Sequence, residues 1–395
     1  MGDSPLAMDA AGIAADYIAA MHIVDSIDFR EVEIMQPEGN MILDQTTLRN
    51  LELTQTLAGE KEGSLLGAID KCRTSMGRRT LKQWILRPLA TKDKIEERQD
   101  AVATIARSSK RLDDLRNNLK GLRDMERLAT QLSYNRSGGR DLVAIGLALE
   151  RMPHLKSLCL EVDNSLLNKL ASDLDVLDMM RIDIQANLND QQPLSLRDGG
   201  IIREGIDKKL DELREAAAKG HQWFKDLEVR ERARLEIPSL KVRHNRQIGW
   251  YIEVTKTHLS KVPEDWNRRQ QMTNGNRYVT EELVEWEEKL VTAASKANSI
   301  EYDMFRDLRD RCREKSRTLG MISSCVAQID VLQCFAKVAR NRSWTRPDIH
   351  DDDRLVAKQL RHPVLELQSG FVPNDIKFDK KRKFLLITGP NMGGK

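Results

Sequence analysis

Aromatic residues are scarce in this chain and charged residues are abundant, at 5% and 32% of 395 residues. Leu, Ala, Glu, Lys and Arg recur throughout, which is typical of long, exposed helices. The length leaves room for two or three domains with a buried core. The composition therefore favours a mainly helical protein.

Cysteine is also sparse, and none of the five cysteines belongs to a C-x-x-C pair. Scattered thiols fit a reducing compartment and are expected to fill the core. The seven histidines show no metal-ligand spacing, so no structural metal is expected. No charged and then apolar leader opens the chain, and no run of about eighteen apolar residues occurs. The sequence therefore argues against secretion and against a membrane partner.

The chain lacks a large excess of either charge. Lys and Arg number 64 and Asp and Glu number 61, which leaves a net charge of +3. No global basic field therefore requires a nucleic-acid partner, and local patches must carry that argument.

The C-terminal stretch contains the most specific pattern. Phe384–Ile387 is a short apolar run, which predicts a buried strand. Gly389, Gly394 and Lys395 then match the P-loop pattern as far as its lysine. In such a loop glycines let backbone N–H groups converge on phosphates, and the lysine meets the outer phosphates. The other interpretation is a glycine-rich turn after a strand.

Apolar residues recur at helical spacing over most of the chain. Helices are expected over Ala10–Ile27, in several segments between Thr46 and Asn189, over 206–236, from 281 to about 317, and over Met321–Ala339. The helix from 281 has a narrow apolar face about 50 Å long at 1.5 Å per residue, which indicates a projecting arm packed on one partner helix. Gly320 is expected to end it.

The two long helices flank an insert of different character, residues 237–280. Leu240–His244 and Gly249–Thr255 alternate like strands around a hairpin turn at Asn245–Gln247, and Asn274–Asn276 predicts a further turn. Since the insert joins the two helices at one end, they are expected to lie side by side, with the insert far from the P-loop segment.

The insert concentrates basic side chains among aromatic residues and asparagines. Lys, Arg, Asn and backbone N–H groups make phosphate contacts, which bind duplex DNA without reading its sequence. The alternative is a solvated charged surface. Trp250 and Ile252 fit core positions better than base stacking, and Glu253 argues against a uniformly basic face. The candidate DNA-binding residues are Lys241, Arg243, Arg246, Arg268, Arg269, Asn274, Asn276 and Arg277.

Nearly the whole chain resembles the MutS family of DNA mismatch-repair ATPases. The terminal stretch LLITGPNMGGK at 385–395 is far more specific than a general P-loop. The other stretches that carry the resemblance are RHPV at 361–364, FVPN at 371–374, IPSLKV at 237–242, GWYIEVT at 249–255, NRYVT at 276–280, LRNLEL at 48–53, Met76-Gly77 and WILRPL at 84–89.

The resemblance implies a dimer, formed with itself or with another MutS-family protein, that encircles mismatched double-stranded DNA and uses ATP to switch state. It also implies a MutL-type partner, ATP or ADP with Mg²⁺ as cofactors, and a bacterial-like cytoplasm or a eukaryotic nucleus as location. Phe371 is expected to stack on adenine. The implied nucleotide-binding residues are Phe371, Gly389, Pro390, Asn391, Met392, Gly393, Gly394 and Lys395.

The expected fold class is mainly α: a long-helix lever with a small β-rich clamp insert, plus the truncated start of an α/β P-loop ATPase domain. The expected parts are a connector remnant (1–28), a helical core (29–205), an ascending lever helix (206–236), the clamp (237–280), descending lever helices (281–345) and the start of the ATPase domain (346–395).

The sequence departs from the family pattern at both ends. The mismatch-reading domain with its Phe-x-Glu wedge is absent, as are most of the ATPase domain and the hydroxyl residue that would hold Mg²⁺. We therefore expect this polypeptide alone not to hydrolyse ATP, and ATP turnover by the purified chain would refute that.

Two other functions stay open. One is a MutS relative without the mismatch reader that acts on recombination junctions, which the missing N-terminal domain favours and the bacterial-looking residues Val262–Pro263 and Arg268–Gln270 oppose. The other is a helical interaction scaffold with a vestigial nucleotide site.

Overall fold

The computed structural model describes residues 5–20, 39–245, 247–367 and 370–389. These residues form a mainly α-helical chain with small antiparallel sheets, as predicted. Two compact units are distinct and are described separately. Unit 1 comprises Met1–Tyr134, Leu147–Asp178 and Glu314–Lys395, and unit 2 comprises Asn135–Gly146 and Met179–Arg313.

Helices make up most of unit 1. Its elements are α1 (Pro5–Ala20), α2 (Gln45–Asn50), α3 (Leu65–Ile69), α4 (Ser75–Leu86), α5 (Lys92–Ala106), α6 (Ser109–Leu119), α7 (Met125–Ser133), α9 (Met152–Leu160), α10 (Ser165–Asp173), α14 (Ser316–Arg342), β5 (Leu355–Leu360), η2 (Leu365–Leu367) and β6 (Asn374–Phe378). Two more helices cross the border between the units, α8 (Gly139–Leu149) and α11 (Asp178–Asn187).

The central helix of unit 1 is α14, against which α4, α5, α6, α7 and α10 pack. By length and composition alone, α14 is apolar enough to cross a bilayer, but 72% of its most apolar window is buried inside the protein. Such burial is what the core helix of a globular unit shows, because its apolar surface is already covered by other helices.

The carboxylate of Asp330 on α14 fixes the start of α4. It accepts hydrogen bonds from the backbone N–H groups of Arg73 (2.9 Å) and Thr74 (2.8 Å) and from the Thr74 hydroxyl (2.7 Å). Thr74 is the N-cap of α4, so the negative charge lies at the end of the helix where N–H groups lack partners. A Cβ atom at Gly77 would collide with this carboxylate, which explains the glycine in the first turn of α4.

All five cysteines are buried free thiols, as predicted. Burial raises the pKa of Cys159 and of Cys312 to about 12 and the pKa of Cys325 to about 11. These thiols therefore stay protonated at neutral pH and serve as small apolar core side chains.

The prediction of a buried strand at Phe384–Ile387 is wrong. These residues form no strand, and their side chains are exposed, from 43% at Leu385 to 79% at Phe384. Such a run is buried only where neighbouring strands and covering helices surround it. Within the described residues, β5 and β6 pair only with each other, and this run pairs with neither of them.

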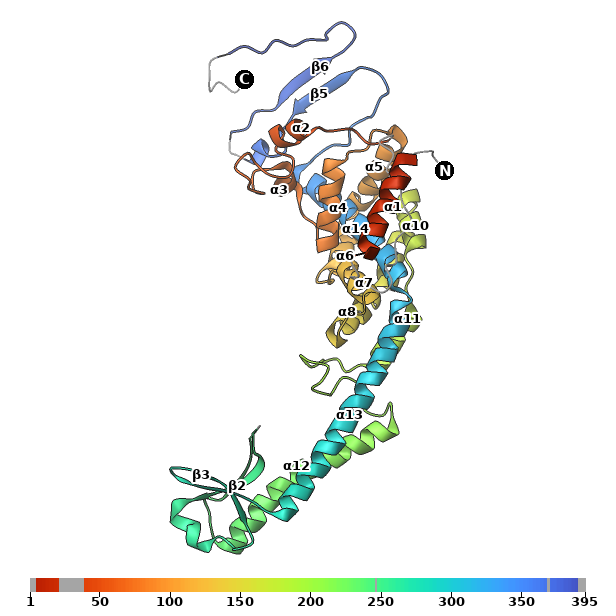
Figure 1. Cartoon of the computed structure of the whole chain (residues 1–395). Coiled ribbons are helices and arrows are strands. Elements are labelled where there is room, and N and C mark those ends of the chain that lie inside the picture. Colours follow the sequence, from red (N-terminus) through yellow and green to blue (C-terminus); the bar gives the residue numbers. More distant parts are fainter. Residues whose placement is uncertain (1–4, 21–38, 246, 368–369, 390–395) are drawn as a thin grey trace. The chain divides into compact units, whose positions relative to one another are not determined.

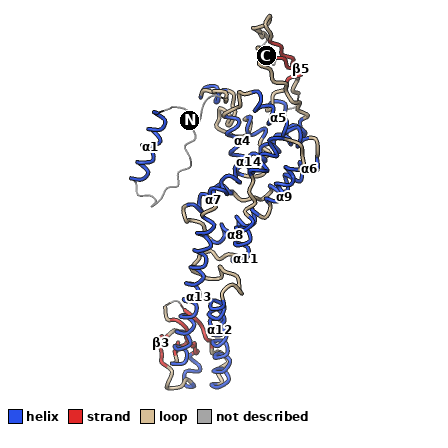
Figure 2. The backbone as a smooth tube through the Cα atoms, turned by 90° about the vertical axis from the view of Figure 1, so that its right-hand side faces the viewer, coloured by secondary structure: helices blue, strands red, loops and turns tan. Residues whose placement is uncertain are grey.

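Unit 2 is built on two long helices, α12 (Lys208–Leu235) and α13 (Glu281–Arg313). They run side by side in both views, with a small sheet at one end (Figures 1 and 2). The absence of a side chain at Gly220 lets them approach closely, because a Cβ atom there would lie 2.8 Å from Cδ1 of Leu290. The predicted pair of neighbouring helices is thus confirmed.

The predicted break at Gly320 is wrong. The helix α13 ends at Arg313, and α14 begins at Ser316 after a turn at Glu314 and Lys315. Gly320 lies inside α14. A glycine costs a helix only about 1 kcal/mol. Its neighbours Leu319 and Ile322 are fully buried, and their burial outweighs that cost.

The sheet of unit 2 lies between α12 and α13 in the sequence. Its strands, β1 (Lys241–Asn245), β2 (Gly249–Thr255), β3 (Asn267–Gln271) and β4 (Gly275–Val279), are antiparallel in the order β1-β2-β4-β3, and η1 (Lys256–Lys261) follows β2. The hairpin of β1 and β2 is confirmed. The predicted turn at Asn274–Asn276 is displaced, because Gly275 and Asn276 already pair with β2 in β4. The distance from this sheet to the P-loop segment stays a prediction, since 390–395 lie outside the described residues.

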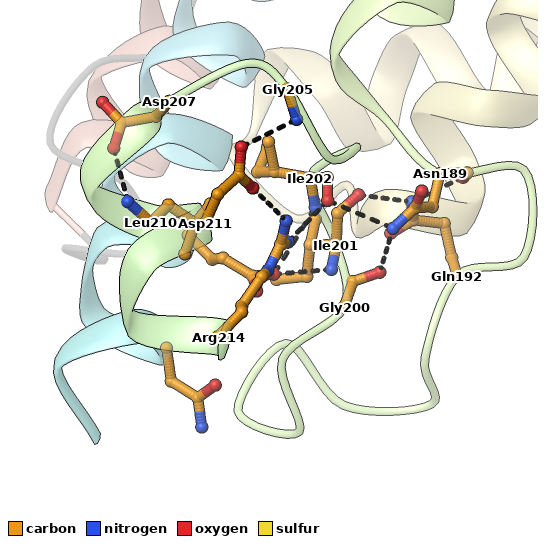
Figure 3. Close-up of polar contacts among 12 residues, drawn as sticks. Asn189, Gln192, Gly200, Ile201, Ile202, Gly205, Asp207, Leu210, Asp211 and Arg214 are labelled. Atoms are coloured by element: carbon orange, nitrogen blue, oxygen red, sulfur yellow. Dashed lines mark hydrogen bonds and ion pairs between the residues drawn. The ribbon is translucent and has the colours of Figure 1, made fainter. Parts of the chain in front are cut away.

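The buried carboxylate of Glu301 on α13 fastens the loop 188–207 to both long helices. It accepts from the N–H group of Ile201 (2.6 Å) and from Nη2 of Arg214 on α12 (2.8 Å). Arg214 also donates to the carbonyl of Ile202 at 2.6 Å (Figure 3). Because Glu301 is only 2% exposed, its charge is compensated by these protein groups rather than by water.

Candidate nucleic-acid interface

A row of four side chains crosses the whole sheet of unit 2. Lys241 on β1 lies opposite Glu253 on β2, Glu253 lies opposite Arg277 on β4, and Arg277 lies opposite Gln270 on β3. Residues directly opposite in an antiparallel sheet point to the same face. Arg243 lies two residues after Lys241 and shares this face. We call it the open face; its row carries two cations, one carboxylate and one amide.

The other face of the sheet packs on the long helices. The ring of Trp250 stacks on Phe224 of α12, with centroids 4.0 Å apart and planes 2° from parallel. Ile252 and Val254 are fully buried in the same cluster, which includes Leu283 of α13. Trp250 and Ile252 are therefore core residues, as predicted, and no base stacking is expected of them.

Two helical carboxylates hold the sheet against the helices. Glu228 of α12 accepts from the N–H group of Val242 at 2.7 Å, and Glu287 of α13 accepts from that of Trp250 at 3.1 Å. Gly249 has a φ of +74°, and a Cβ atom there would collide with Glu287. The sheet is thus fixed on α12 and α13 through its backbone as well as its apolar side chains.

Arg268 and Arg269 lie on the edge strand β3, all of whose residues are exposed. The pairing with β4 shifts register between Arg268 and Gln270, so Arg269 is the extra residue of a β-bulge. Neither guanidinium has an ion pair or a hydrogen bond within the part of the chain that the structure describes. Both are free to meet an external anion.

The arginines of α12 differ from Arg268 and Arg269, because each of them forms an ion pair with a carboxylate within 4 Å. Their partners are Glu301 for Arg214, Glu282 for Arg230, Glu228 for Arg232 and Glu231 for Arg234. Lys241 and Arg243 resemble Arg268 instead: both are exposed, and neither has an ion pair among the described residues. Arginines without a carboxylate partner among the described residues are therefore found on the sheet, whereas the four arginines of α12 are all paired.

Arg277 is half-buried on the open face. Its guanidinium lies over the ring of Tyr251, 4.4 Å from the centroid, and its Nη1 donates to Gln270 at 2.8 Å. Nε is buried without a partner in the described structure. The aromatic ring and the amide hold this guanidinium in place without neutralising its charge.

The two candidate asparagines have different environments. Asn274 is exposed in the turn between β3 and β4. Asn276 is only 6% exposed, and its amide donates to the Tyr278 hydroxyl at 3.1 Å. Asn276 therefore supports the sheet from inside and does not face solvent. Arg246 lies outside the described residues.

Residues 46–336 match the family model described as MutS domain III. The chain belongs to the MutS family. It is similar to proteins named DNA mismatch repair protein MutS from several organisms. The one from Oceanobacillus iheyensis is 39% identical over 371 residues, which cover 93% of this chain and 43% of that protein. The one from Methanosarcina barkeri is 41% identical over 366 residues, which cover 90% and 40%.

The MutS protein of Desulforamulus reducens is 36% identical over 398 residues, which cover 100% of this chain and 46% of that relative. This MutS-family chain thus spans less than half the length of the curated relatives it matches. What those whole proteins do enters below only as a proposal.

Six of the eight residues expected to bind nucleotide in this MutS-family chain, 390–395, lie outside the described residues. Phe371 is half-buried in the loop before β6, and Gly389 is exposed at the end of the described chain. The structure therefore leaves the nucleotide site as a prediction.

The two carboxylates that hold the sheet of this MutS-family chain, those of Glu228 and Glu287, could not be predicted from the sequence. Glu228 and Glu287 are two of many glutamates on charged helices, and nothing in their spacing separates them from solvated ones. Glu287 has one signal, the Gly249 that leaves room for it. Because the two residues are 38 positions apart, only the folded structure shows that they meet.

Proposed function

We propose that the sheet of unit 2 binds the phosphate backbone of double-stranded DNA, as part of a DNA mismatch-repair protein of the MutS family. The observation that carries the proposal is the set of unpaired cations at Lys241, Arg243, Arg268 and Arg269, beside a helix whose arginines all have carboxylate partners. A protein surface that gathers uncompensated cations suits a polyanion.

The contacts proposed are to phosphates rather than to bases. Lys and Arg on an exposed strand and its neighbours suit phosphate oxygens, whereas base reading needs side chains that enter a groove in a fixed register. Arg277 would join them from its place over Tyr251, and Asn274 from the turn. Asn276 would act indirectly, by supporting β4.

Contacts that read no sequence let a protein move along DNA. Together with the family membership, this supports a clamp that slides on mismatched duplex DNA in an ATP-dependent cycle. The parts proposed for it are a connector remnant (1–28), a core (29–205), lever helices (206–236 and 281–345), the clamp (237–280) and the start of an ATPase domain (346–395).

The remaining proposals rest on the family resemblance. Phe371 and Gly389 to Lys395 would bind ATP or ADP with Mg²⁺. The partners would be a second MutS-family subunit and a MutL-type protein, in a bacterial cytoplasm or a eukaryotic nucleus.

Gel shifts of the purified chain on matched, mismatched and junction DNA over a range of salt concentrations test the proposal. We expect binding to every duplex, with an affinity that falls steeply with salt because each phosphate contact releases counterions. The slope of log affinity against log salt should correspond to about four to six phosphates at roughly 0.9 per phosphate. Binding to junctions alone would favour the junction-acting relative. The absence of salt-sensitive binding to any duplex would leave the helical scaffold.

A further inference from the structure

Glu253 is the one acidic residue in the four described strands of the sheet, and its carboxylate lies in the middle of the basic open face. It is directly opposite Lys241 on one side and Arg277 on the other. Cross-strand neighbours of this kind have Cβ atoms about 4.5–5.5 Å apart. Every DNA phosphate that meets Lys241 or Arg277 would therefore also approach Glu253.

The negative charge of Glu253 is not used elsewhere in the fold. Its side chain is half-buried, and within the described residues its carboxylate has no hydrogen bond and no ion pair. The Arg277 guanidinium is held instead by Tyr251 and Gln270. Glu253 thus differs from Glu228 and Glu287, whose carboxylates each bind a strand N–H group.

We propose that Glu253 limits the affinity of the sheet for DNA, as a fixed negative charge that repels the phosphates bound by Lys241 and Arg277. This inference rests on the proposed function and assigns a role to one residue within it. Two unit charges about 8 Å apart change a binding constant by about 2-fold at the dielectric constant of water and by about 30-fold at that of a protein surface, and screening by salt places an exposed pair between these limits. Glu253 therefore keeps contacts with a polyanion weak enough to be exchanged as the sheet moves along DNA.

The variant Glu253→Gln tests this role, because it removes the charge and keeps the size of the side chain. We expect it to bind matched duplex about 3- to 10-fold more tightly than the unmodified chain near 0.05 M salt, with the gain shrinking as salt screens the repulsion. The gain should be equal for matched and mismatched duplex, since no base is read.

Glu288→Gln is the matched control. Glu288 is exposed on α13 in the same unit and has no ion pair among the described residues, so its removal changes the net charge equally without altering the open face. Its affinity should stay within about 1.5-fold of the unmodified chain. Equal gains in both variants would show a general charge effect and overturn the inference.

The outcomes separate this inference from the proposed function. If the unmodified chain binds duplex in a salt-sensitive manner but Glu253→Gln binds no more tightly, only the role of Glu253 is wrong. If no duplex is bound at any salt concentration, the proposed function itself fails.

Tryptophan fluorescence checks that the variant folds, since Trp250 and Trp266 belong to the sheet region. Should Glu253→Gln fail to fold, Glu253→Thr removes the same charge with a good strand former and must show the same gain.

Discussion

Reversing the charge of Arg268, Arg269 and Arg277 to Glu should abolish duplex binding near 0.1 M salt, with a loss of more than about 100-fold in affinity. The first two guanidiniums are unpaired on the edge strand, and the third is held over Tyr251 on the open face. Each reversal removes one phosphate contact and adds a repulsive charge. The slope of log affinity against log salt should fall by about 2 to 3.

A matched variant reverses three lysines on the helices instead, Lys209, Lys225 and Lys296. All three are exposed, lie on α12 or α13 and have no ion pair among the described residues. The change in net charge is the same, so affinity should fall far less than in the arginine variant. Equal losses in the two variants, or an unchanged affinity in the arginine variant, would remove the sheet from the proposed interface.

Glu301→Ala should destabilise unit 2 by about 3 kcal/mol, because it leaves a partly buried guanidinium with only the longer contact to Asp211, at 3.4 Å, among the described residues. The side chain of Arg214 is 21% exposed, and its main acidic partner is Glu301 at 2.8 Å. The N–H group of Ile201 loses its acceptor as well, which adds an unsatisfied buried donor. Urea unfolding followed by tryptophan fluorescence measures the loss, since Trp223, Trp250 and Trp286 lie in this unit.

Hydrogen exchange at the amides of Ile201 and Ile202 gives a local measurement of the same effect, and exchange should become much faster in Glu301→Ala. Glu215→Ala is the control. Glu215 is exposed on α12, and among the described residues its one ion-pair partner is Lys219, one turn along the helix, so its loss should leave both measurements unchanged. If the two variants behave alike, the buried contacts of Glu301 do not stabilise the unit.

The elements with a clear periodic pattern could be predicted from the sequence. The alternation at Gly249–Thr255 predicted β2, and the long amphipathic stretches predicted α12 and α13 within a few residues. The prediction failed where a local signal competed with tertiary pairing. Asn274–Asn276 is rich in turn-forming residues, but backbone pairing with β2 draws Gly275 and Asn276 into β4.

The prediction of a strand at Phe384–Ile387 failed for the opposite reason. Its composition is typical of a strand, but the run pairs with no strand in the described structure. The candidate interface was found as a concentration of basic residues, but composition does not show which cations are already paired. Arg234 and Arg268 look alike in the sequence, yet one has Glu231 at 2.7 Å and the other has no acidic partner among the described residues. The burial of Asn276 likewise depends on which face of β4 it occupies.

The chain enters the sheet of unit 2 from the end of α12 and leaves it at the start of α13, which lies beside α12. The two connections of the sheet, after Leu235 and before Glu281, are therefore close to the same end of the pair of helices α12 and α13. An insertion with adjacent ends is easily exchanged in evolution, because a longer, shorter or different module can replace it without rerouting the rest of the polypeptide. A different module in place of residues 237–280 would therefore leave the course of α12 and α13 unchanged.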